Sequence, residues 1–442
     1  MLTFNLNIIP KVKGAYVVGG SIRDILANRV PNDYDFVVAG SAKDFAYGIA
    51  EKTNGHVALL GKPGFTLYRV SSGIGLFDVL SVAGKTIEED LSKRDFTVNA
   101  MAVEVDSGAL IDPFNGFKDL KEKKIKMVSE QAFIDDPVRL LRVYRLAAQF
   151  NFNIEDQTQK AVKRHCLLID EPSRERIHSE LLGILKTSGS YRYVRLMMHS
   201  GLLFAIIPEL SVLSGLKPDK GVPEIHSYEK MEAVLANPYL YISGEGRAFN
   251  KFDENVGLLK FAVLLTSLLN PEKCTGISDV GNRCFFGSIE VEVSMVAAIC
   301  QNLRFSEDEQ GYICHVIKNY QIPGYLFALS QRKESSDRAI SRFFYKCKDI
   351  VPDIVLVALV NDSSADSRFV SFLKQLLNDY YKKFVPLYNL APLITGQDLI
   401  SELPLTPSSG VKAILDQIRE ARLDGQISSR HEALEMAKRI IS

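Results

Sequence analysis

The chain reads Ala15-Tyr-Val-Val-Gly-Gly-Ser-Ile-Arg-Asp24 close to its N-terminus and Asp33-Tyr-Asp-Phe-Val-Val38 shortly afterwards. Each segment contains an apolar, strand-like run, and the first run ends at two glycines that precede a predicted helix. The glycines let backbone N–H groups approach a phosphate, and a helix N-terminus favours negative charge there. The pattern therefore predicts a phosphate-binding turn at Gly19 and Gly20.

The second segment carries two carboxylates on one side of a strand. Side chains alternate faces along a strand, so Asp33 and Asp35 project in the same direction. Adjacent carboxylates repel each other unless a cation lies between them. Mg²⁺ prefers oxygen ligands and usually shares its coordination shell with phosphates. A phosphate-binding turn beside a magnesium site is the outline of a nucleotidyl-transfer centre.

The composition is that of an ordinary globular protein. With 442 residues, 46% hydrophobic and 24% charged, the chain is long enough for roughly two to four domains. It has no signal-peptide pattern and no run of about 18 apolar residues, so we expect a cytoplasmic protein without a membrane span. Six scattered cysteines without a Cys-x-x-Cys pair predict reduced thiols. Zero net charge argues against broad coating of nucleic acid but allows a local basic groove.

Strand-like and helical segments alternate over residues 14–105, and helical periodicity dominates from about Pro137 onward. Strands are expected at Ala15–Val18, Asp35–Val38, His56–Leu60, Thr66–Val70, Leu76–Leu80 and Ala100–Glu104. Helices are expected at Ile22–Ala27 and at Ala42–Thr53, with Ser41 as N-cap. The pattern predicts an α+β protein, with a small mixed α/β head followed by an extended all-α body and tail.

Two further charged positions have alternative interpretations. Asp78 lies in the apolar run Gly75-Leu-Phe-Asp-Val-Leu80, where an unpaired charge would cost several kcal/mol. It is either a third carboxylate of the centre or a residue on a solvated face. In Lys93-Arg94-Asp95, Arg94 is suited to bind triphosphate and Asp95 to hold Arg94 or a ribose, with Asn99 nearby. The alternative is a helix-end salt bridge, worth under about 1 kcal/mol when exposed.

A later segment places a carboxylate beside several arginines. Asp136 and Pro137 predict a helix start, with Asp136 as N-cap and Pro137 as the first helical residue. Arg139, Arg142 and Arg145 follow at three-residue spacing and form a staggered basic ridge on one helix face. Such a rim offers an acceptor and donors to the Watson–Crick edge of a base. The alternative is a capped amphipathic helix with salt-bridged arginines.

These blocks, in this order, resemble the class II tRNA nucleotidyltransferases, the CCA-adding enzymes, and their bacterial poly(A) polymerase relatives. Supporting blocks are Leu110-Ile-Asp-Pro-Phe-Asn-Gly-Phe-Lys-Asp-Leu120, Phe133–Arg145 and Glu175-Arg-Ile-His-Ser-Glu-Leu181. The match runs over roughly residues 14–215 and returns at residues 393–399 and 419–434, which resemble tRNA-binding helices of the family. The resemblance implies a polymerase-β-like catalytic head (1–135), a helical neck that recognises the base (136–215), a helical body (216–350) and a tRNA-binding tail (351–442).

The resemblance also assigns roles to residues. Asp33 and Asp35 would be the catalytic, Mg²⁺-binding carboxylates. The base would be recognised by Asp136 and Arg139, so that the protein acts as the template, because a wrong base leaves buried polar groups unpaired. The acceptor would be the 3′ end of tRNA, recognised by shape and backbone. The complete predicted nucleotide-binding set is Gly19, Gly20, Arg23, Asp24, Arg94, Asp95, Asn99, Asp136, Arg139, Arg142 and Arg145.

The sequence departs from the family pattern at three places. Asp135 stands where the family usually has Glu, and Lys93 stands where it usually has Arg. The segment from Leu80 to Glu89 is short, whereas full CCA-adding enzymes carry a longer flexible loop here that lets the pocket change from C to A. Members with a short loop resemble the CC-adding enzymes. The sequence therefore favours CC addition, with ordinary variation in loop length as the alternative.

Residues 261–271 resemble a helix of a metal-dependent phosphohydrolase domain that one relative of the family carries. Thr266 and Ser267 occupy the places of its His-Asp dyad. We therefore expect a helical spacer without phosphohydrolase activity, in which His226 is an ordinary polar residue at a helix start.

Three functions are open on the sequence alone. We expect an enzyme that adds CMP from CTP, with or without AMP from ATP, to the tRNA 3′ end and releases pyrophosphate. Poly(A) polymerase is the second, although family poly(A) enzymes often have very basic tails and residues 419–442 mix acids and bases. An inactive RNA-binding protein is the third, and the intact pair Asp33 and Asp35 argues against it. The sequence does not determine an oligomeric state.

Overall fold

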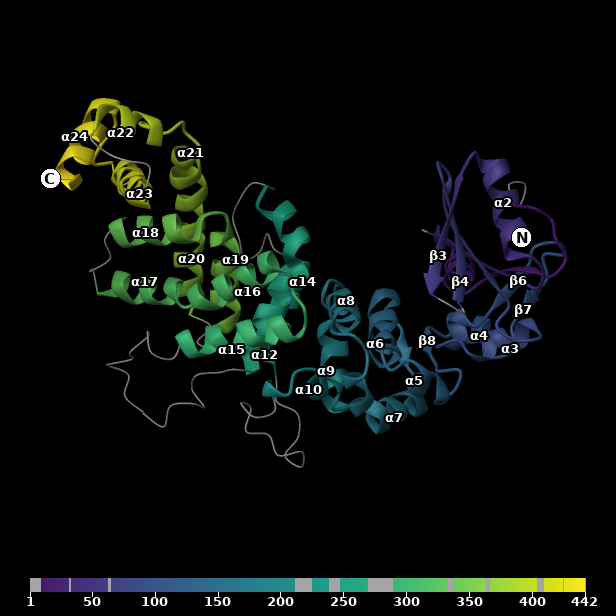
Figure 1. The fold of residues 1–442 in the computed structure, drawn as a ribbon. Coiled ribbons are helices and arrows are strands. Elements are labelled where there is room, and N and C mark those ends of the chain that lie inside the picture. The colour runs from purple at the N-terminus through teal and green to yellow at the C-terminus, as the bar shows by residue number, and fades with distance from the viewer. Residues whose placement is uncertain are drawn as a thin grey trace. The chain divides into compact units, whose positions relative to one another are not determined.

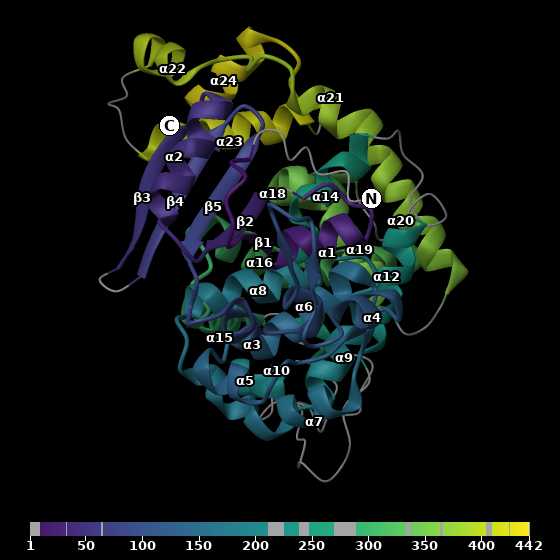
Figure 2. The same cartoon turned by 90° about the vertical axis from the view of Figure 1, so that its right-hand side faces the viewer.

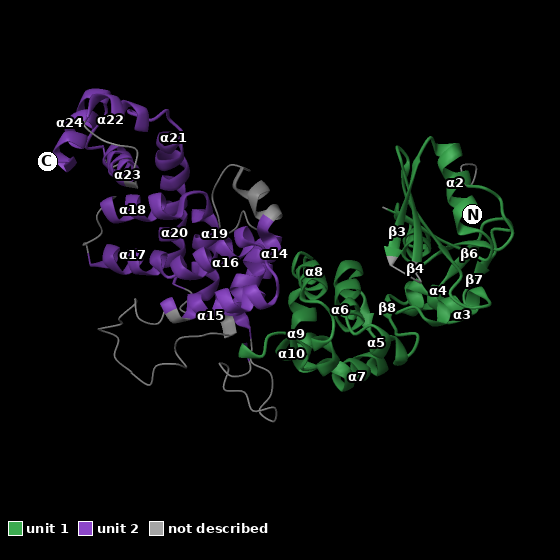
Figure 3. Cartoon of the chain, viewed as in Figure 1, with its two compact units in different colours: residues 1–209 green, residues 210–442 purple. Residues whose placement is uncertain are grey.

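The computed structural model describes residues 9–31, 33–62, 65–210, 225–237, 247–268, 289–332, 337–362, 366–403, 409–423 and 425–441. They form two compact units, residues 1–209 and residues 210–442 (Figure 3). The four-part division that the sequence suggests is finer than these two units and stays a prediction.

A seven-stranded mixed sheet forms the head of the first unit (Figure 1). Its strands are β1 (Ala15–Val18), β2 (Asp33–Val38), β3 (His56–Lys62), β4 (Phe65–Ser72), β5 (Gly75–Ser81), β6 (Ala102–Glu104) and β7 (Leu110–Ile111), in the order β3-β4-β5-β2-β1-β6-β7. Strands β2 and β5 are parallel, and the other neighbours are antiparallel. The predicted mixed α/β head is confirmed.

One predicted strand is shorter than expected. Residues Thr97–Asn99 form a 3₁₀ turn, and the strand begins at Ala102 rather than at Ala100. The N–H groups of Asn99 and Ala100 bond back to the carbonyls of Phe96 and Thr97, so they cannot join the sheet ladder.

One face of β2 packs against helix α2 (Ala42–Thr53). The Phe36 ring lies 5.4 Å from the Phe45 ring of α2, centroid to centroid. Figure 2 shows α2 running along β3 and β4. The predicted cap of this helix is confirmed, because the Ser41 side chain accepts a hydrogen bond from the Asp44 N–H.

The opposite face of β2 carries both buried apolar and charged side chains. Val37 joins a core cluster with Leu91 of helix α3 (Ile87–Ser92). Asp33 and Asp35 lie on the same face, since every second residue of a strand points the same way. The apolar end of this face anchors the strand, and the other end presents the two carboxylates.

The rest of the first unit is largely helical. Its helices are α1 (Gly20–Leu26), α4 (Gly116–Lys121), α5 (Gln131–Asp135), α6 (Arg139–Phe150), α7 (Asp156–His165), α8 (Arg174–Leu185), α9 (Tyr191–His199) and α10 (Leu202–Ile206), with a short parallel pair β8 (Lys124–Ile125) and β9 (Asn153–Ile154). Helices α6 and α8 pack against each other. Leu141, Tyr144 and Leu181 are fully buried, which confirms the helical periodicity.

The described part of the second unit consists of helices and contains no strand. They are α12 (His226–Ala236), α14 (Arg247–Leu268), α15 (Ile289–Asn302), α16 (Glu307–Asn319), α17 (Ile322–Gln331), α18 (Asp337–Cys347), α19 (Val351–Asn361), α20 (Ser367–Asp379), α21 (Val385–Tyr388), α22 (Gly396–Glu402), α23 (Ser409–Leu423) and α24 (Arg430–Ile441). His226 begins α12, and the buried Thr266 hydroxyl accepts from the Asn361 amide at 3.2 Å. None of the helices described is long and apolar enough to cross a membrane.

Gly116 allows a close approach between α4 and the 3₁₀ turn. A Cβ added there would lie 2.0 Å from the Thr97 carbonyl oxygen. We expect Gly116→Ala to lower the free energy of unfolding by about 1–3 kcal/mol or more, because backbone must move to make room. Urea unfolding measures the change. Gly40→Ala is the matched control, since an added Cβ there has no neighbour within 4 Å; equal losses in both variants would contradict the close packing.

Candidate active site

A polar pocket of about 460 Å³ lies where the head meets helix α6. It is lined by Gly19, Gly20, Arg23, Asp24, Asp33, Asp35, Arg94, Asp95, Asn99, Arg139, Arg142, Arg145, Leu146 and Gln149. All predicted site residues except Asp136 are among them. The structure therefore brings the glycine turn, the carboxylate pair and the arginine ridge together around one hollow, which we call the arginine-rich pocket.

The turn between β1 and α1 is narrow at Gly19. This residue has φ +71°, a conformation that L side chains rarely adopt. A Cβ added to it would lie 3.6 Å from Asp35 Oδ2 and 3.6 Å from Arg94 Nη1. Gly20 is the first residue of α1, so N–H groups without intrahelical partners lie at this edge of the pocket.

The two carboxylates of β2 line the pocket and differ in their exposure to solvent. Asp33 is exposed and Asp35 is half-buried. Burial, followed by the negative charge of Asp33, raises the pKa of Asp35 to about 6. Ser21, which sequence reasoning missed, braces the strand: its Oγ accepts from the Asp35 N–H at 3.1 Å and donates to the Asp33 carbonyl at 3.3 Å.

Asp78 lies beside this pair rather than on a solvated face. It is the neighbour of Asp35 across the parallel β2–β5 pairing, and it is 9% exposed. Arg69 on β4 donates from Nε and Nη2 to the two carboxylate oxygens of Asp78, each at 2.7 Å. Asp78 is thus the partner of a bidentate ion pair, whereas the Asp33 and Asp35 carboxylates have no such partner within the described chain.

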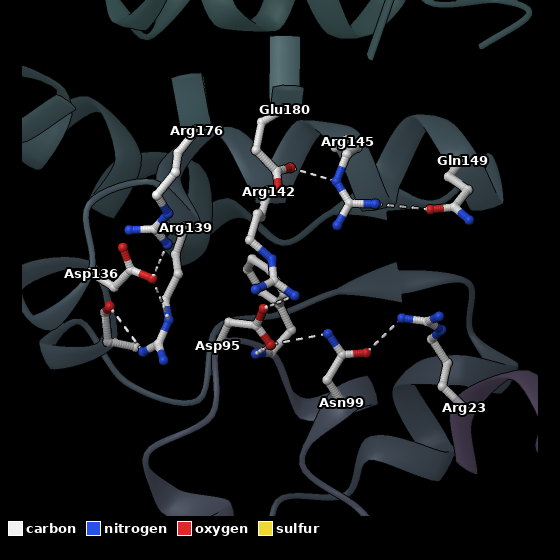
Figure 4. A network of polar contacts seen from close by, with 12 residues as sticks. Arg23, Asp95, Asn99, Asp136, Arg139, Arg142, Arg145, Gln149, Arg176 and Glu180 are labelled. Atoms are coloured by element: carbon white, nitrogen blue, oxygen red, sulfur yellow. Dashed lines mark hydrogen bonds and ion pairs between the residues drawn. The ribbon is translucent and has the colours of Figure 1, made fainter. Parts of the chain in front are cut away.

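A chain of polar contacts crosses the pocket from α1 to α6 (Figure 4). Arg23 donates to Asp24 from Nε and Nη2 and to Asn99 Oδ1 from Nη1 at 2.8 Å. Asn99 donates in turn to Asp95 Oδ1 at 3.0 Å. Arg142 Nη2 lies 3.0 Å from Asp95 Oδ2 without hydrogen-bond geometry, so this contact is an ion pair and Asp95 Oδ2 is a buried acceptor that makes no hydrogen bond in the described structure.

The helix-end salt bridge considered for Arg94 is present, although Arg94 also lines the pocket. Its Nη2 lies 2.9 Å from Asp90 Oδ2, one helical turn earlier. Asp90 also accepts from the Ala83 N–H at 3.1 Å, and Lys93 Nζ donates to the Ala83 carbonyl at 2.8 Å. The short segment after β5 is therefore fastened to α3.

The predicted cap at Asp136 is wrong. Asp136 follows helix α5, and α6 begins at Arg139 with Val138 at its N-cap position and no side-chain cap. The Asp136 carboxylate instead accepts from Arg176 Nη2 at 2.7 Å and lies 3.9 Å from Arg139 Nε. A charged guanidinium is a stronger partner for a carboxylate than a neutral backbone N–H, so the side chain turns toward α8.

Helix α8 supplies two supporting residues that sequence reasoning did not single out. Arg176 holds Asp136, and Glu180 accepts from Arg145 Nε (Figure 4). Arg145 also donates to Gln149 at 3.3 Å. Arg176 and Glu180 are four residues apart and share one helix face, which was the signal in the sequence. Spacing alone does not say which helix that face meets.

The charges of the pocket nearly balance, with five arginines and four aspartates in its lining. Within the described ranges, no cluster of three His, Cys, Asp or Glu side chains could hold a metal ion. The residues nevertheless fit a divalent cation, because Asp33 and Asp35 offer hard oxygen donors and phosphates or water can complete the shell.

The chain matches known proteins over most of its length. A family model described as the poly A polymerase head domain matches residues 15–126, and one described as the probable RNA and SrmB-binding site of polymerase A matches residues 151–213. A multifunctional CCA protein from Nitrosococcus oceani is 30% identical over 74% of this chain and 81% of that protein. The chain belongs to the CCA-adding tRNA nucleotidyltransferase family.

Other members match almost end to end. A CC-adding tRNA nucleotidyltransferase from Synechocystis is 28% identical over 99% of this chain and 95% of that protein. An A-adding tRNA nucleotidyltransferase from Deinococcus radiodurans is 26% identical over 97% of this chain and 96% of that protein. The Thermotoga maritima CCA-adding enzyme complexed with tRNA shares the fold, with a TM-score of 0.64 at 22% identity over 97% of this chain and 91% of that one.

The comparisons confirm the predicted family, the fold and the assignment as an enzyme. Nucleotidyltransferases of this family generally use a divalent metal. Because the relatives are named CC-adding, A-adding and multifunctional, membership alone does not specify which nucleotides a member adds.

The raised pKa of Asp35 predicts that the metal-free protein loses folding stability as the pH rises. Its folded value of about 6 exceeds the ordinary 3.8, so the folded state holds the proton more tightly than the unfolded chain does. Stability therefore falls as the pH rises from about 4 to about 6, and the cost is complete above that range. We expect Asp35→Asn to melt at a higher temperature than wild type at pH 7.5 in EDTA, with a smaller difference at pH 4.5.

Thermal unfolding followed by circular dichroism at both pH values checks this expectation. Asp106→Asn, at an exposed aspartate outside the pocket, is the control. A difference between Asp35→Asn and wild type that grew toward acid pH would contradict the assigned direction.

Proposed function

We propose that this enzyme adds two cytidines to the 3′ end of tRNA, using CTP and releasing pyrophosphate. The observation that carries the proposal is the arginine-rich pocket, which joins a glycine turn and a carboxylate pair to the arginine ridge of α6. In the reaction the 3′-hydroxyl gives up its proton to solvent and its oxygen bonds to the α-phosphorus, while the bond to the pyrophosphate oxygen breaks. Transfer needs no nucleic-acid template, because the protein groups select the base.

The triphosphate is proposed to lie against the turn at Gly19 and Gly20, close to Arg23 and Arg94. Backbone N–H groups at the start of α1 and the two guanidinium groups would bind its oxygens. Asp95 Oδ2 is a buried acceptor without a hydrogen bond and is suited to accept one from a ribose hydroxyl. This contact would place the sugar between the phosphates and the base.

Asp33 and Asp35 are proposed to hold the divalent cation, with Mg²⁺ as the physiological ion. When bound, the cation would supply charge stabilisation at the α-phosphate and at the leaving pyrophosphate. Ser21 keeps β2 in place beneath the two carboxylates. Arg69 would hold the Asp78 carboxylate in its ion pair, so that the Asp33 and Asp35 oxygens are the ones available to the cation.

Base selection is proposed to lie at Asp136 and Arg139. A carboxylate accepts from the exocyclic amine of cytosine, whereas uracil would present a carbonyl oxygen and repel it. Arg139 can donate to the ring acceptors of cytosine. Arg176 occupies one oxygen of Asp136 and fixes its direction, leaving the other oxygen for the base.

The segment between β5 and α3 supports CC addition over full CCA addition. Family members that add all three nucleotides typically have a long flexible loop here. In this chain residues 82–86 connect the two elements, and Ala83 is held through both its N–H and its carbonyl. The Lys85 N–H also donates to Glu89 at 2.7 Å. A connection fastened in this way is poorly suited to reshape the pocket for adenine.

Single-turnover extension of tRNA transcripts tests the proposal. We expect the full chain with Mg²⁺ and CTP to extend tRNA that lacks its CCA end by two nucleotides, and to add no nucleotide to tRNA-CC when ATP is supplied. Denaturing gels at single-nucleotide resolution measure the products. Addition of A to tRNA-CC would show full CCA addition, and long ATP-dependent products would indicate poly(A) polymerase. No incorporation at all would indicate an inactive RNA-binding protein.

Removing one carboxylate separates catalysis from RNA binding. We expect Asp33→Ala to reduce CMP transfer by at least about a thousandfold, because the remaining carboxylate holds a cation weakly. The Kd for tRNA, measured by filter binding, should stay within about twofold of wild type. Asp106→Ala is the matched control, at an exposed aspartate outside the pocket. Weak tRNA binding together with retained transfer would refute the assignment.

A further inference from the structure

Two arginines lie over the same aromatic ring at the edge of the arginine-rich pocket. The guanidinium carbons of Arg23 and Arg29 are each 4.5 Å from the centroid of the Phe150 ring. Phe150 is the last residue of α6 and is 7% exposed, so its ring position is fixed by packing. Arg23 is nearly buried and lines the pocket, whereas Arg29 is exposed just outside that lining.

The backbone directs Arg29 to this place. Helix α1 ends at Leu26, Asn28 follows with φ +56°, and the Arg29 N–H donates back to the Asp24 carbonyl at 2.7 Å. Such a left-handed helix stop fixes the residue that follows it. The side chain of Arg29 therefore starts from a defined backbone position rather than from a loose loop.

The two guanidinium groups differ in what they can still bind. The Nε, Nη1 and Nη2 atoms of Arg23 already donate to Asp24 and Asn99. In the described chain no carboxylate pairs with Arg29, and contact with a ring face uses no hydrogen-bond acceptor, so its N–H donors remain available to a ligand.

We infer that Arg29 is a phosphate-binding residue at the rim of the arginine-rich pocket and that Phe150 is its positioning residue. The ligand is a phosphate group, supplied either by the triphosphate of the nucleotide or by the backbone of the RNA 3′ end. The ring lowers the entropy that a long exposed side chain would lose on binding. This inference rests on the proposed function and adds a contact that neither the glycine turn nor the carboxylate pair provides.

Equilibrium binding to the full chain tests the inference without relying on turnover. The probes are CTP with Mg²⁺, and a tRNA transcript lacking its CCA end at 50–200 mM KCl. We expect Arg29→Gln to raise one of the two Kd values about three- to tenfold. A higher Kd for CTP assigns the nucleotide phosphate; a higher Kd for tRNA, with a salt slope smaller by about 1, assigns a backbone phosphate.

Phe150→Leu and the double variant test the role of the ring. We expect Phe150→Leu to raise the Kd for the same ligand. The double variant should have the same Kd as Arg29→Gln alone, because the ring acts through the arginine. Lys121→Gln is the matched control, since Lys121 is exposed, lies over the ring of Phe117 and is not in the pocket lining. Arg29→Lys, which keeps the charge but not the planar contact, should bind between wild type and Arg29→Gln.

Unchanged Kd values for both ligands in Arg29→Gln, or an equal loss in Lys121→Gln, would overturn the inference. Circular dichroism and the thermal midpoint show whether each variant is folded, and Arg29→Lys replaces Arg29→Gln should the latter not fold. Failure of the proposed function looks different: wild type would then transfer no CMP to tRNA, while the dependence of binding on Arg29 could still be measured.

Discussion

The ion pair between Asp95 and Arg142 joins the two halves of the pocket. Asp95 belongs to the head and is 5% exposed, and Arg142 belongs to helix α6. Arg142 is 33% exposed, and Asp95 also accepts hydrogen bonds from the Phe96 N–H and from Asn99, so the pair is one member of a contact network that links the two halves. Through Asn99 the same carboxylate also fixes Arg23. The distance between the proposed phosphate and base sites is thereby built into the protein before any ligand arrives.

The arginine ridge of α6 illustrates how a nearly neutral protein can hold a concentrated set of cations. Arg139 faces Asp136, Arg142 faces Asp95 and Arg145 faces Glu180. Each acid holds its arginine in one orientation and offsets its charge. On the proposed assignment an incoming base would therefore meet ordered donors, and little side-chain entropy would be lost when it binds. The acids also limit the attraction of unrelated anions, in keeping with a net charge of zero.

Local patterns predicted the parts of the structure that depend on local geometry. The alternation along β2 placed Asp33 and Asp35 on one face, and the capping residue Ser41 was identified because its partner is three residues away. The error at Asp136 has the opposite origin. Its carboxylate pairs with a guanidinium 40 residues further along the chain, and spacing around position 136 contains no trace of that partner.

The environment of Asp78 could not be predicted without the strand order, for the same reason. Its neighbour Asp35 is reached through a parallel pairing, and Arg69 is reached through the adjacent antiparallel strand. Likewise, Phe150 appears in the sequence as one more apolar position of a helix. Its contact with two arginines of the head becomes visible only when α1 and α6 are brought together. Tertiary pairings of this kind lie beyond periodicity and capping rules.

The left-handed glycine at position 19 has an evolutionary consequence. Any side chain there would strain the backbone and would also enter the space between Asp35 and Arg94. Selection for a folded head and, on the proposed assignment, selection for phosphate binding therefore act on the same position, so a substitution there would affect both. The direction of the Asp136 carboxylate, by contrast, depends on Arg176, a side chain of another helix. On the proposed assignments, the phosphate site is thus fixed by backbone conformation, whereas the base site depends on a pair of side chains.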